Sequence, residues 1–99
     1  MQNNDNQHFT GDIALAAYLA YRGFPVEGFV EDDRRPGKLI FAFGQHSSTD
    51  PNGLAEITSA SGAADLFYRG EAKVDPRRFY NEVNDMRARL YEEKDRAGR

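Results

Sequence analysis

The chain has 99 residues and no cysteine, which excludes disulfides, thiolate zinc sites and a cysteine nucleophile. With 39% hydrophobic and 29% charged residues, it is rich enough in apolar side chains for one folded core, so a fully disordered chain is excluded. A net charge of −3 argues against a protein that coats nucleic acid without selectivity, but it is compatible with a local phosphate-binding site.

Both ends of the chain are polar, and a single domain is expected between them. Residues 1–8 are rich in Asn and Gln and predict a disordered tail, residues 9–92 predict one α+β domain, and residues 93–99 predict a charged tail. The N-terminus lacks the basic and then apolar layout of a signal peptide. The longest apolar run is far shorter than the roughly 20 residues that span a bilayer. We therefore expect a cytoplasmic protein that has no membrane contact.

The stretch from Phe9 to Phe24 predicts a largely buried first helix. Thr10 can cap this helix through its hydroxyl, and Asp12 lies in the first turn, where the helix dipole favours a negative charge. Gly23 supplies the left-handed residue that commonly follows a helix. Almost every residue between these signals is apolar, so no broad solvated face remains.

Two extended segments follow and predict a β-hairpin. Apolar and polar residues alternate in 24–31, and residues 38–44 give the clearest strand pattern of the chain. A polar turn that closes with a Pro-Gly dipeptide joins the two segments. The alternation assigns Val26 and Val30 to one face of the hairpin and Phe29 to the other.

The second half of the chain predicts a loop, a short helix and a long helix. Residues 45–53 have a loop composition, and Ser61 is expected to cap a short helix that ends before Gly70. Asp75, followed by proline, begins the last helix. Apolar side chains then recur at spacings of 4, 3 and 4, at Phe79, Val83, Met86 and Leu90.

Several spaced motifs stand out along residues 9–91. Phe9 begins the run Phe-Thr-x-Asp-x-Ala-Leu-Ala-Ala-Tyr-Leu, Tyr68 begins Tyr-x-Gly, and Val74 begins Val-x-Pro-x-x-Phe. Together these motifs resemble a family of small domains of unknown function that occur in bacteria and their phages. The resemblance implies the α+β architecture and a phage or mobile-element origin, and it implies no catalytic residue.

The residues contain no convincing catalytic or metal constellation. His46, Ser47, Ser48 and Asp50 are the residue types of a hydrolase triad, but a triad normally draws its members from separate elements, and these are near neighbours in one loop. His8 and His46 are the only histidines, and neither has a second ligand three or four residues away. We expect a protein that is not an enzyme and holds neither a metal nor a cofactor.

Two groups of cations could bind phosphate. Arg34 and Arg35 lie in the hairpin turn, where a basic turn can follow a nucleic-acid backbone. Lys73, Arg77 and Arg78 lie at the start of the last helix, where free amides also attract anions.

Each group has a local alternative. Asp32 and Asp33 reduce the field beside the turn arginines, and they are themselves expected to solvate or cap the turn. Asp75 and Glu82 can neutralise the arginines of the last helix, because surface charge pairs are common.

The predicted hairpin needs cover, because a two-stranded sheet is only marginally stable in water. Helices are expected to cover one face, which leaves Phe29, Ile40 and Ala42 exposed beside open strand edges. A homodimer that pairs hairpins or stacks sheets would cover this face. Alternatively, residues 54–68 fold over it within one monomer.

The predicted fold is therefore α+β, with a helix, a β-hairpin, a short helix and a long C-terminal helix, the helices packing on one face of a two-stranded antiparallel sheet. The predicted function is a small non-enzymatic interaction or regulatory module of phage or mobile-element type, homodimeric through the hairpin. The alternative is a nucleic-acid-associated protein that binds phosphates through the arginines named above.

Overall fold

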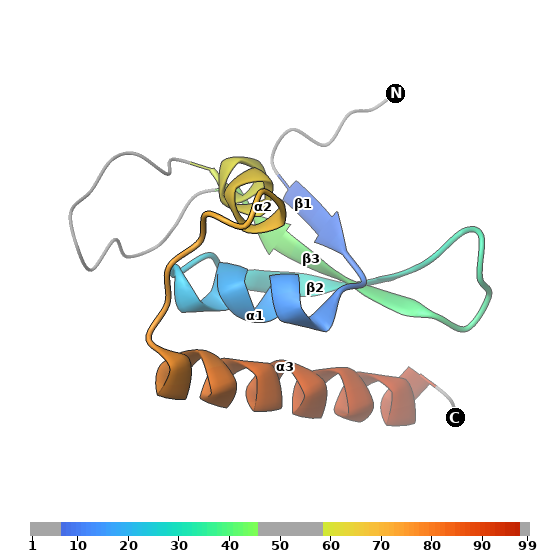
Figure 1. Cartoon of the computed structure of the whole chain (residues 1–99). Helices are drawn as coiled ribbons and strands as arrows, with labels where there is room; N and C mark the ends of the chain where they lie inside the picture. Colours follow the sequence, from blue (N-terminus) through green and yellow to red (C-terminus); the bar gives the residue numbers. More distant parts are fainter. Residues whose placement is uncertain (1–6, 46–58, 98–99) are drawn as a thin grey trace.

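A computed structural model describes residues 7–45 and 59–97. Within these residues the chain forms an α+β fold with three helices and a three-stranded antiparallel sheet (Figure 1). Helix α1 lies between the sheet and α3, while α2 packs beside α1 and β1. The strands are β1 (Gln7–Thr10), β2 (Val26–Glu31) and β3 (Leu39–Gly44), and the helices are α1 (Ile13–Tyr21), α2 (Ala60–Tyr68) and α3 (Pro76–Ala97).

The third strand, β1, corrects the prediction of a two-stranded sheet. The strand order is β1-β3-β2, so β3 is the central strand. Strand β1 pairs antiparallel with β3, from Gln7 opposite Gly44 to Thr10 opposite Phe41. Gln7 and His8, which the sequence assigns to a disordered tail, belong to this strand. The physical reason is that β3 has two hydrogen-bonding edges, and the hairpin with β2 satisfies only one of them.

A β-bulge changes which side chains of β2 face the helices. The pairing of β2 with β3 shifts after Val26, and Glu27 is the extra residue. Beyond the bulge, Phe29 turns towards the helices, and its ring centroid lies 5.0 Å from that of Phe41. Val30 turns to the opposite face. The predicted faces of Phe29 and Val30 are therefore wrong, because one extra residue reverses the alternation that follows it.

The buried helix α1 is confirmed, but its cap is not the predicted one. Asp12 is the N-cap, and its Oδ1 accepts hydrogen bonds from the amides of Ala14 and Leu15 at 2.9 and 3.3 Å. Thr10 ends β1 instead, and its hydroxyl accepts from the Asp12 amide at 3.0 Å. Gly23 follows the helix with a φ of 93°, as its position predicts.

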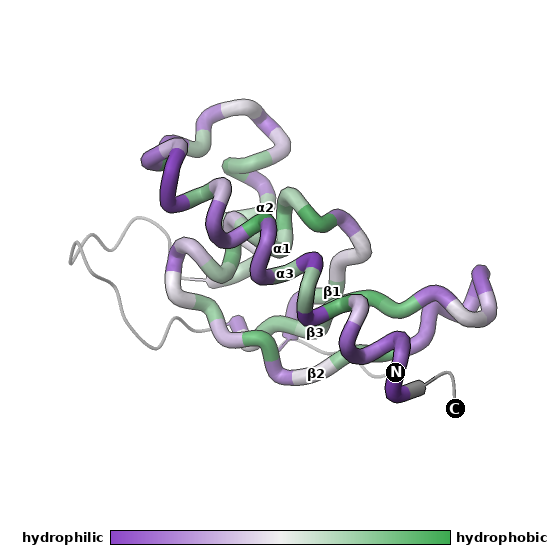
Figure 2. Tube along the Cα trace, turned by 90° about the horizontal axis from the view of Figure 1, so that it is seen from below, coloured by the Kyte–Doolittle hydropathy of each residue, from purple (hydrophilic) through white to green (hydrophobic). Residues whose placement is uncertain are grey.

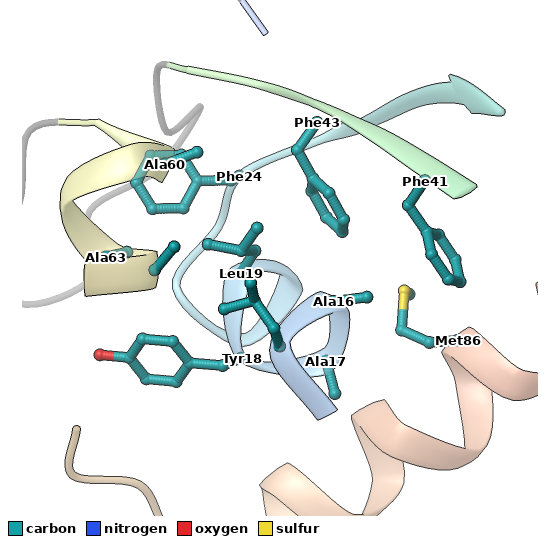
Figure 3. Packing of buried hydrophobic residues seen from close by; sticks show 12 residues of the cluster. Ala16, Ala17, Tyr18, Leu19, Phe24, Phe41, Phe43, Ala60, Ala63 and Met86 are labelled. Atoms are coloured by element: carbon teal, nitrogen blue, oxygen red, sulfur yellow. The ribbon is translucent and has the colours of Figure 1, made fainter. Parts of the chain in front are cut away.

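The core forms around α1 (Figure 3). Ala16 and Ala17 are fully buried, and their small side chains let neighbouring elements approach α1 closely. Met86 of α3 reaches the same core and is also buried. The other fully or almost fully buried apolar residues of this cluster are Leu15, Tyr18, Leu19, Phe24, Phe41, Phe43, Ala60, Ala63 and Ala64.

The last two helices follow the sequence signals with small shifts. Ser59 caps α2 through its Oγ, which accepts from the Gly62 amide at 3.0 Å, so the cap lies two residues before the predicted Ser61. Helix α3 begins at the predicted proline and continues to Ala97, into the region predicted as a charged tail. None of the helices in the described parts of the chain is long and apolar enough to cross a membrane. His46, Ser47, Ser48 and Asp50 lie outside the described residues.

Candidate functional site

The sheet face that points away from the helices carries an apolar patch, which we call the outer patch. It consists of Phe9 of β1, Val30 of β2 and Ile40 of β3. The register places all three on the face opposite Phe41, because side chains alternate along each strand. Val30 is 40% exposed, while Phe9 and Ile40 are half-buried. Each strand of the sheet therefore contributes one apolar side chain to the outer patch.

The hairpin turn borders the outer patch, and Figure 2 shows the change from hydrophobic strand to hydrophilic turn. A shallow hollow joins the three apolar side chains to residues 31–34, at the end of β2 and the start of the turn. Asp32 Oδ1 accepts from the Arg34 amide at 3.0 Å, and Glu31 Oε2 accepts from the Gly37 amide at 2.7 Å. The predicted role of Asp32 in capping the turn backbone is thus confirmed.

The structure separates the three residues predicted as an interface. Ile40 belongs to the outer patch, but Phe29 packs against Phe41 on the helix side. Ala42 lies on the outer side of β3 and is almost fully buried. Of the three, only Ile40 lies in the outer patch, and the sequence analysis does not place Phe9 or Val30 on this face, because the first placement needs β1 and the second needs the bulge. The glycine that follows Glu27 was the available sequence signal for the bulge.

The predicted cation groups lie at opposite ends of the molecule (Figure 1). Arg34 and Arg35 are exposed at the tip of the hairpin, and neither forms an ion pair with another described residue. Lys73 and Arg77 are exposed at or just before the start of α3. The five predicted cations therefore do not form one site.

Arg78 has a structural contact rather than a free charge. Its guanidinium carbon lies 4.7 Å from the ring centroid of Tyr21, a cation–π contact that joins α3 to α1. The Tyr21 hydroxyl accepts from the Asp75 amide at 2.9 Å, and Asp75 Oδ2 accepts from the Arg78 amide at 3.0 Å. Asp75 thus caps the backbone of α3, and Arg78 is held by an aromatic ring.

No protein-family model, curated protein or solved structure matches the chain. The resemblance drawn from the motifs therefore stays a prediction. The outer patch is the part of the described surface where apolar side chains from separate strands meet.

A polar cluster fastens α2 to the sheet. His8 Nδ1 lies 3.0 Å from Ser61 Oγ, which also accepts from Gln45 Nε2 at 2.8 Å. Gln45 Oε1 in turn accepts from the Ser61 amide at 2.9 Å. A serine beside a histidine is the form of a nucleophile and base, but here the Ser61 amide and hydroxyl are both bonded within the fold. The described residues also hold no group of three His, Cys, Asp or Glu that could bind a metal.

Acidification is expected to weaken the fold through His8. Burial lowers the pKa of His8 from its usual 6.5, so the unfolded chain takes up the proton first as the pH falls. The loss of unfolding free energy should begin near pH 6.5 and be complete once the pH is below the folded-state pKa. Urea unfolding of the wild type and His8→Gln, across this range, measures the effect.

The matched variant isolates His8 from other groups. Burial, with the nearby Asp85 charge, raises the pKa of Glu82, which opposes the His8 effect because the folded chain then binds the proton first. Glu82 is present in both proteins, so it cancels in their difference. An identical pH dependence of wild type and His8→Gln would contradict the prediction.

Proposed function

We propose that this protein is a small non-enzymatic interaction module that forms a homodimer through the outer patch. The observation that supports this most is the position of Phe9, Val30 and Ile40 on the sheet face opposite the helices. An apolar patch that is partly exposed on the surface of a domain is a recognised association site. Helix α2, which is part of the segment considered as an alternative cover, packs against α1 and β1 on the other side. Residues 54–58 of that segment lie outside the described residues.

Charges around the outer patch favour a second copy as the partner. Residues 31–38 carry three acidic and three basic side chains, so this border has no net charge. A two-fold axis places the same patch on both copies, so Asp33 of one copy can oppose Arg34 of the other. A polyanion would gain nothing from a border in which acids and bases are equal.

Sedimentation of the full chain over a range of concentrations tests the dimer. A wild-type dimer is expected, and Val30→Ser should raise its Kd about tenfold or more, because the interface contains the substitution twice and each loss is worth about 1 kcal/mol. Tyr80→Ser is the matched control, since Tyr80 is 65% exposed on α3 and lies away from the sheet. A wild type that is monomeric at every concentration, or a Tyr80→Ser variant that dissociates as readily as Val30→Ser, would overturn the proposal.

A further inference from the structure

The six cationic side chains of α3 form two sets of three, which differ in whether the charge has a partner within the fold. One set is engaged within the fold. Arg78 lies over the Tyr21 ring, Arg89 pairs with Asp85 at 3.5 Å, and Arg96 pairs with Glu93 at 2.9 Å. These three side chains therefore have their charges compensated or stacked.

The other set is free. Arg77, Arg87 and Lys94 are exposed and make no ion pair with any residue in the described ranges. Two large aromatic side chains of the same helix are also exposed, Tyr80 at 65% and Tyr91 at 61%. Water surrounds most of both rings although α3 has an apolar side against α1.

The free cations and the exposed tyrosines lie on one face of α3. When Asn84 is counted with them, the successive spacings are 3, 4, 3, 4 and 3, which keeps these residues on one face along the whole helix. We call this face the basic-aromatic stripe, and its members are Arg77, Tyr80, Asn84, Arg87, Tyr91 and Lys94.

The carboxylates of α3 lie elsewhere. Glu82, Asp85, Glu92 and Glu93 occupy the opposite flank, beyond the buried side of the helix. Asp95 alone approaches the stripe, at its C-terminal margin. The stripe therefore carries three positive charges on a protein whose net charge is −3, and such segregation gives a local field that the total charge conceals.

We propose that the basic-aromatic stripe binds single-stranded nucleic acid. Arg77, Arg87 and Lys94 would contact backbone phosphates, and bases would stack on Tyr80 and Tyr91. A single strand is favoured over a duplex because only unpaired bases expose the faces on which a tyrosine ring can stack. The two rings are eleven residues apart, about 16 Å along the helix, so several nucleotides fit between them.

This site differs from the one predicted from the sequence. Of the predicted cations only Arg77 belongs to the stripe, since Arg78 is held by Tyr21 and Arg34 lies at the hairpin tip. The sequence alone does not distinguish Arg87 from the other arginines of α3, because only the structure shows which of them form ion pairs. The site also lies on the side of α1 away from the sheet, so it does not depend on the outer patch.

Fluorescence anisotropy with a labelled oligothymidylate, measured on the full chain at several salt concentrations, tests the proposal. Removing both charges in Arg77→Gln with Arg87→Gln should lower the affinity at low salt about tenfold or more. It should also flatten the slope of log K against log salt by about 1.4, since each phosphate contact contributes about 0.7 for single strands. Tyr91→Leu should lower the affinity about fivefold or more and leave the slope unchanged.

The matched control removes two charges from the same helix. Arg89→Gln with Arg96→Gln changes the net charge equally on the opposite flank, so it should keep the wild-type slope. Val30→Ser should bind a short oligothymidylate like the wild type, which distinguishes a failure of this site from a failure of the dimer. Absence of binding at low salt, or equal losses in the two arginine pairs, would overturn the proposal. Tighter binding of polyglutamate than of the oligonucleotide, with no effect of Tyr91→Leu, would overturn it in favour of an acidic protein partner.

Discussion

Replacing Phe41 by alanine is expected to lower the free energy of unfolding by about 3–5 kcal/mol, the usual loss for a buried phenylalanine. Phe41 is fully buried on the central strand, and its ring centroid lies 5.0 Å from that of Phe29 and 6.1 Å from that of Phe43. Met86 approaches it from α3 (Figure 3). The truncated side chain would leave a cavity, because the packed sheet and helices cannot move far enough to fill it.

Urea unfolding measures this loss, and Val30, an outward-facing residue of the neighbouring strand, provides the control. A domain of this size has a total stability of about 5–15 kcal/mol, so Phe41→Ala should move the midpoint far towards low urea or leave the chain unfolded. Val30→Ala changes an exposed side chain of the outer patch and should cost less than about 1 kcal/mol in the monomer. Similar losses for the two variants would show that the faces of the sheet have been assigned wrongly.

Replacing His8 by proline is expected to be far more damaging than replacing it by alanine, because β1 is part of the sheet. The hydrogen bond from the Asp32 amide to the Lys38 carbonyl, at 2.8 Å, fixes the alternation of the ladder. Successive residues of β3 bond alternately to β2 and to β1. Since Lys38 bonds to the β2 side, Phe43 bonds to the β1 side, where His8 is its partner in the register. Proline has no amide hydrogen, so the buried Phe43 carbonyl would lose its donor.

Comparing the two His8 variants separates the contribution of the backbone hydrogen bond to stability from that of the side chain. His8→Ala removes the imidazole and its contact with Ser61 Oγ, at a cost of about 1 kcal/mol. His8→Pro removes the same side chain and the ladder bond, and should cost at least about 2 kcal/mol more. Chemical denaturation of both variants at neutral pH provides the values. Equal stability would mean that residues 7 and 8 lie outside the sheet, as the sequence alone predicts.

The two proposed surfaces are compatible in one assembly. Helix α3 lies on the far side of α1 from the sheet (Figure 1), so a dimer formed through the outer patch would leave both basic-aromatic stripes exposed. Two stripes on one particle could engage two segments of the same strand, which raises the apparent affinity without any new contact. Val30→Ser would then reduce the affinity for a long oligonucleotide and leave that for a short one unchanged.

The sequence by itself determines the helices and the hairpin of this protein. The helix signals are local: Gly23 after α1, the Asp75–Pro76 start of α3, and the stripe of apolar residues that carries Met86 into the core. Asp85 and Arg89 are four residues apart on α3, a spacing that brings their side chains together, and they form an ion pair at 3.5 Å. Caps, periodicity and i,i+4 contacts involve residues within one or two turns, so they can be read along the chain.

The tertiary structure decided which strands pair and which side chains face outward. Strand β1 pairs with β3, which lies more than thirty residues further along the chain. The four residues of β1 do not by themselves predict such a distant partner. One extra residue at Glu27 moves Phe29 into the core and Val30 onto the surface, because side chains in a strand alternate with a period of two. The freedom of Arg87 likewise depends on where the carboxylates around it find their partners. Sheet pairing, bulges and charge pairing are contacts between distant segments, and only the folded chain brings those segments together.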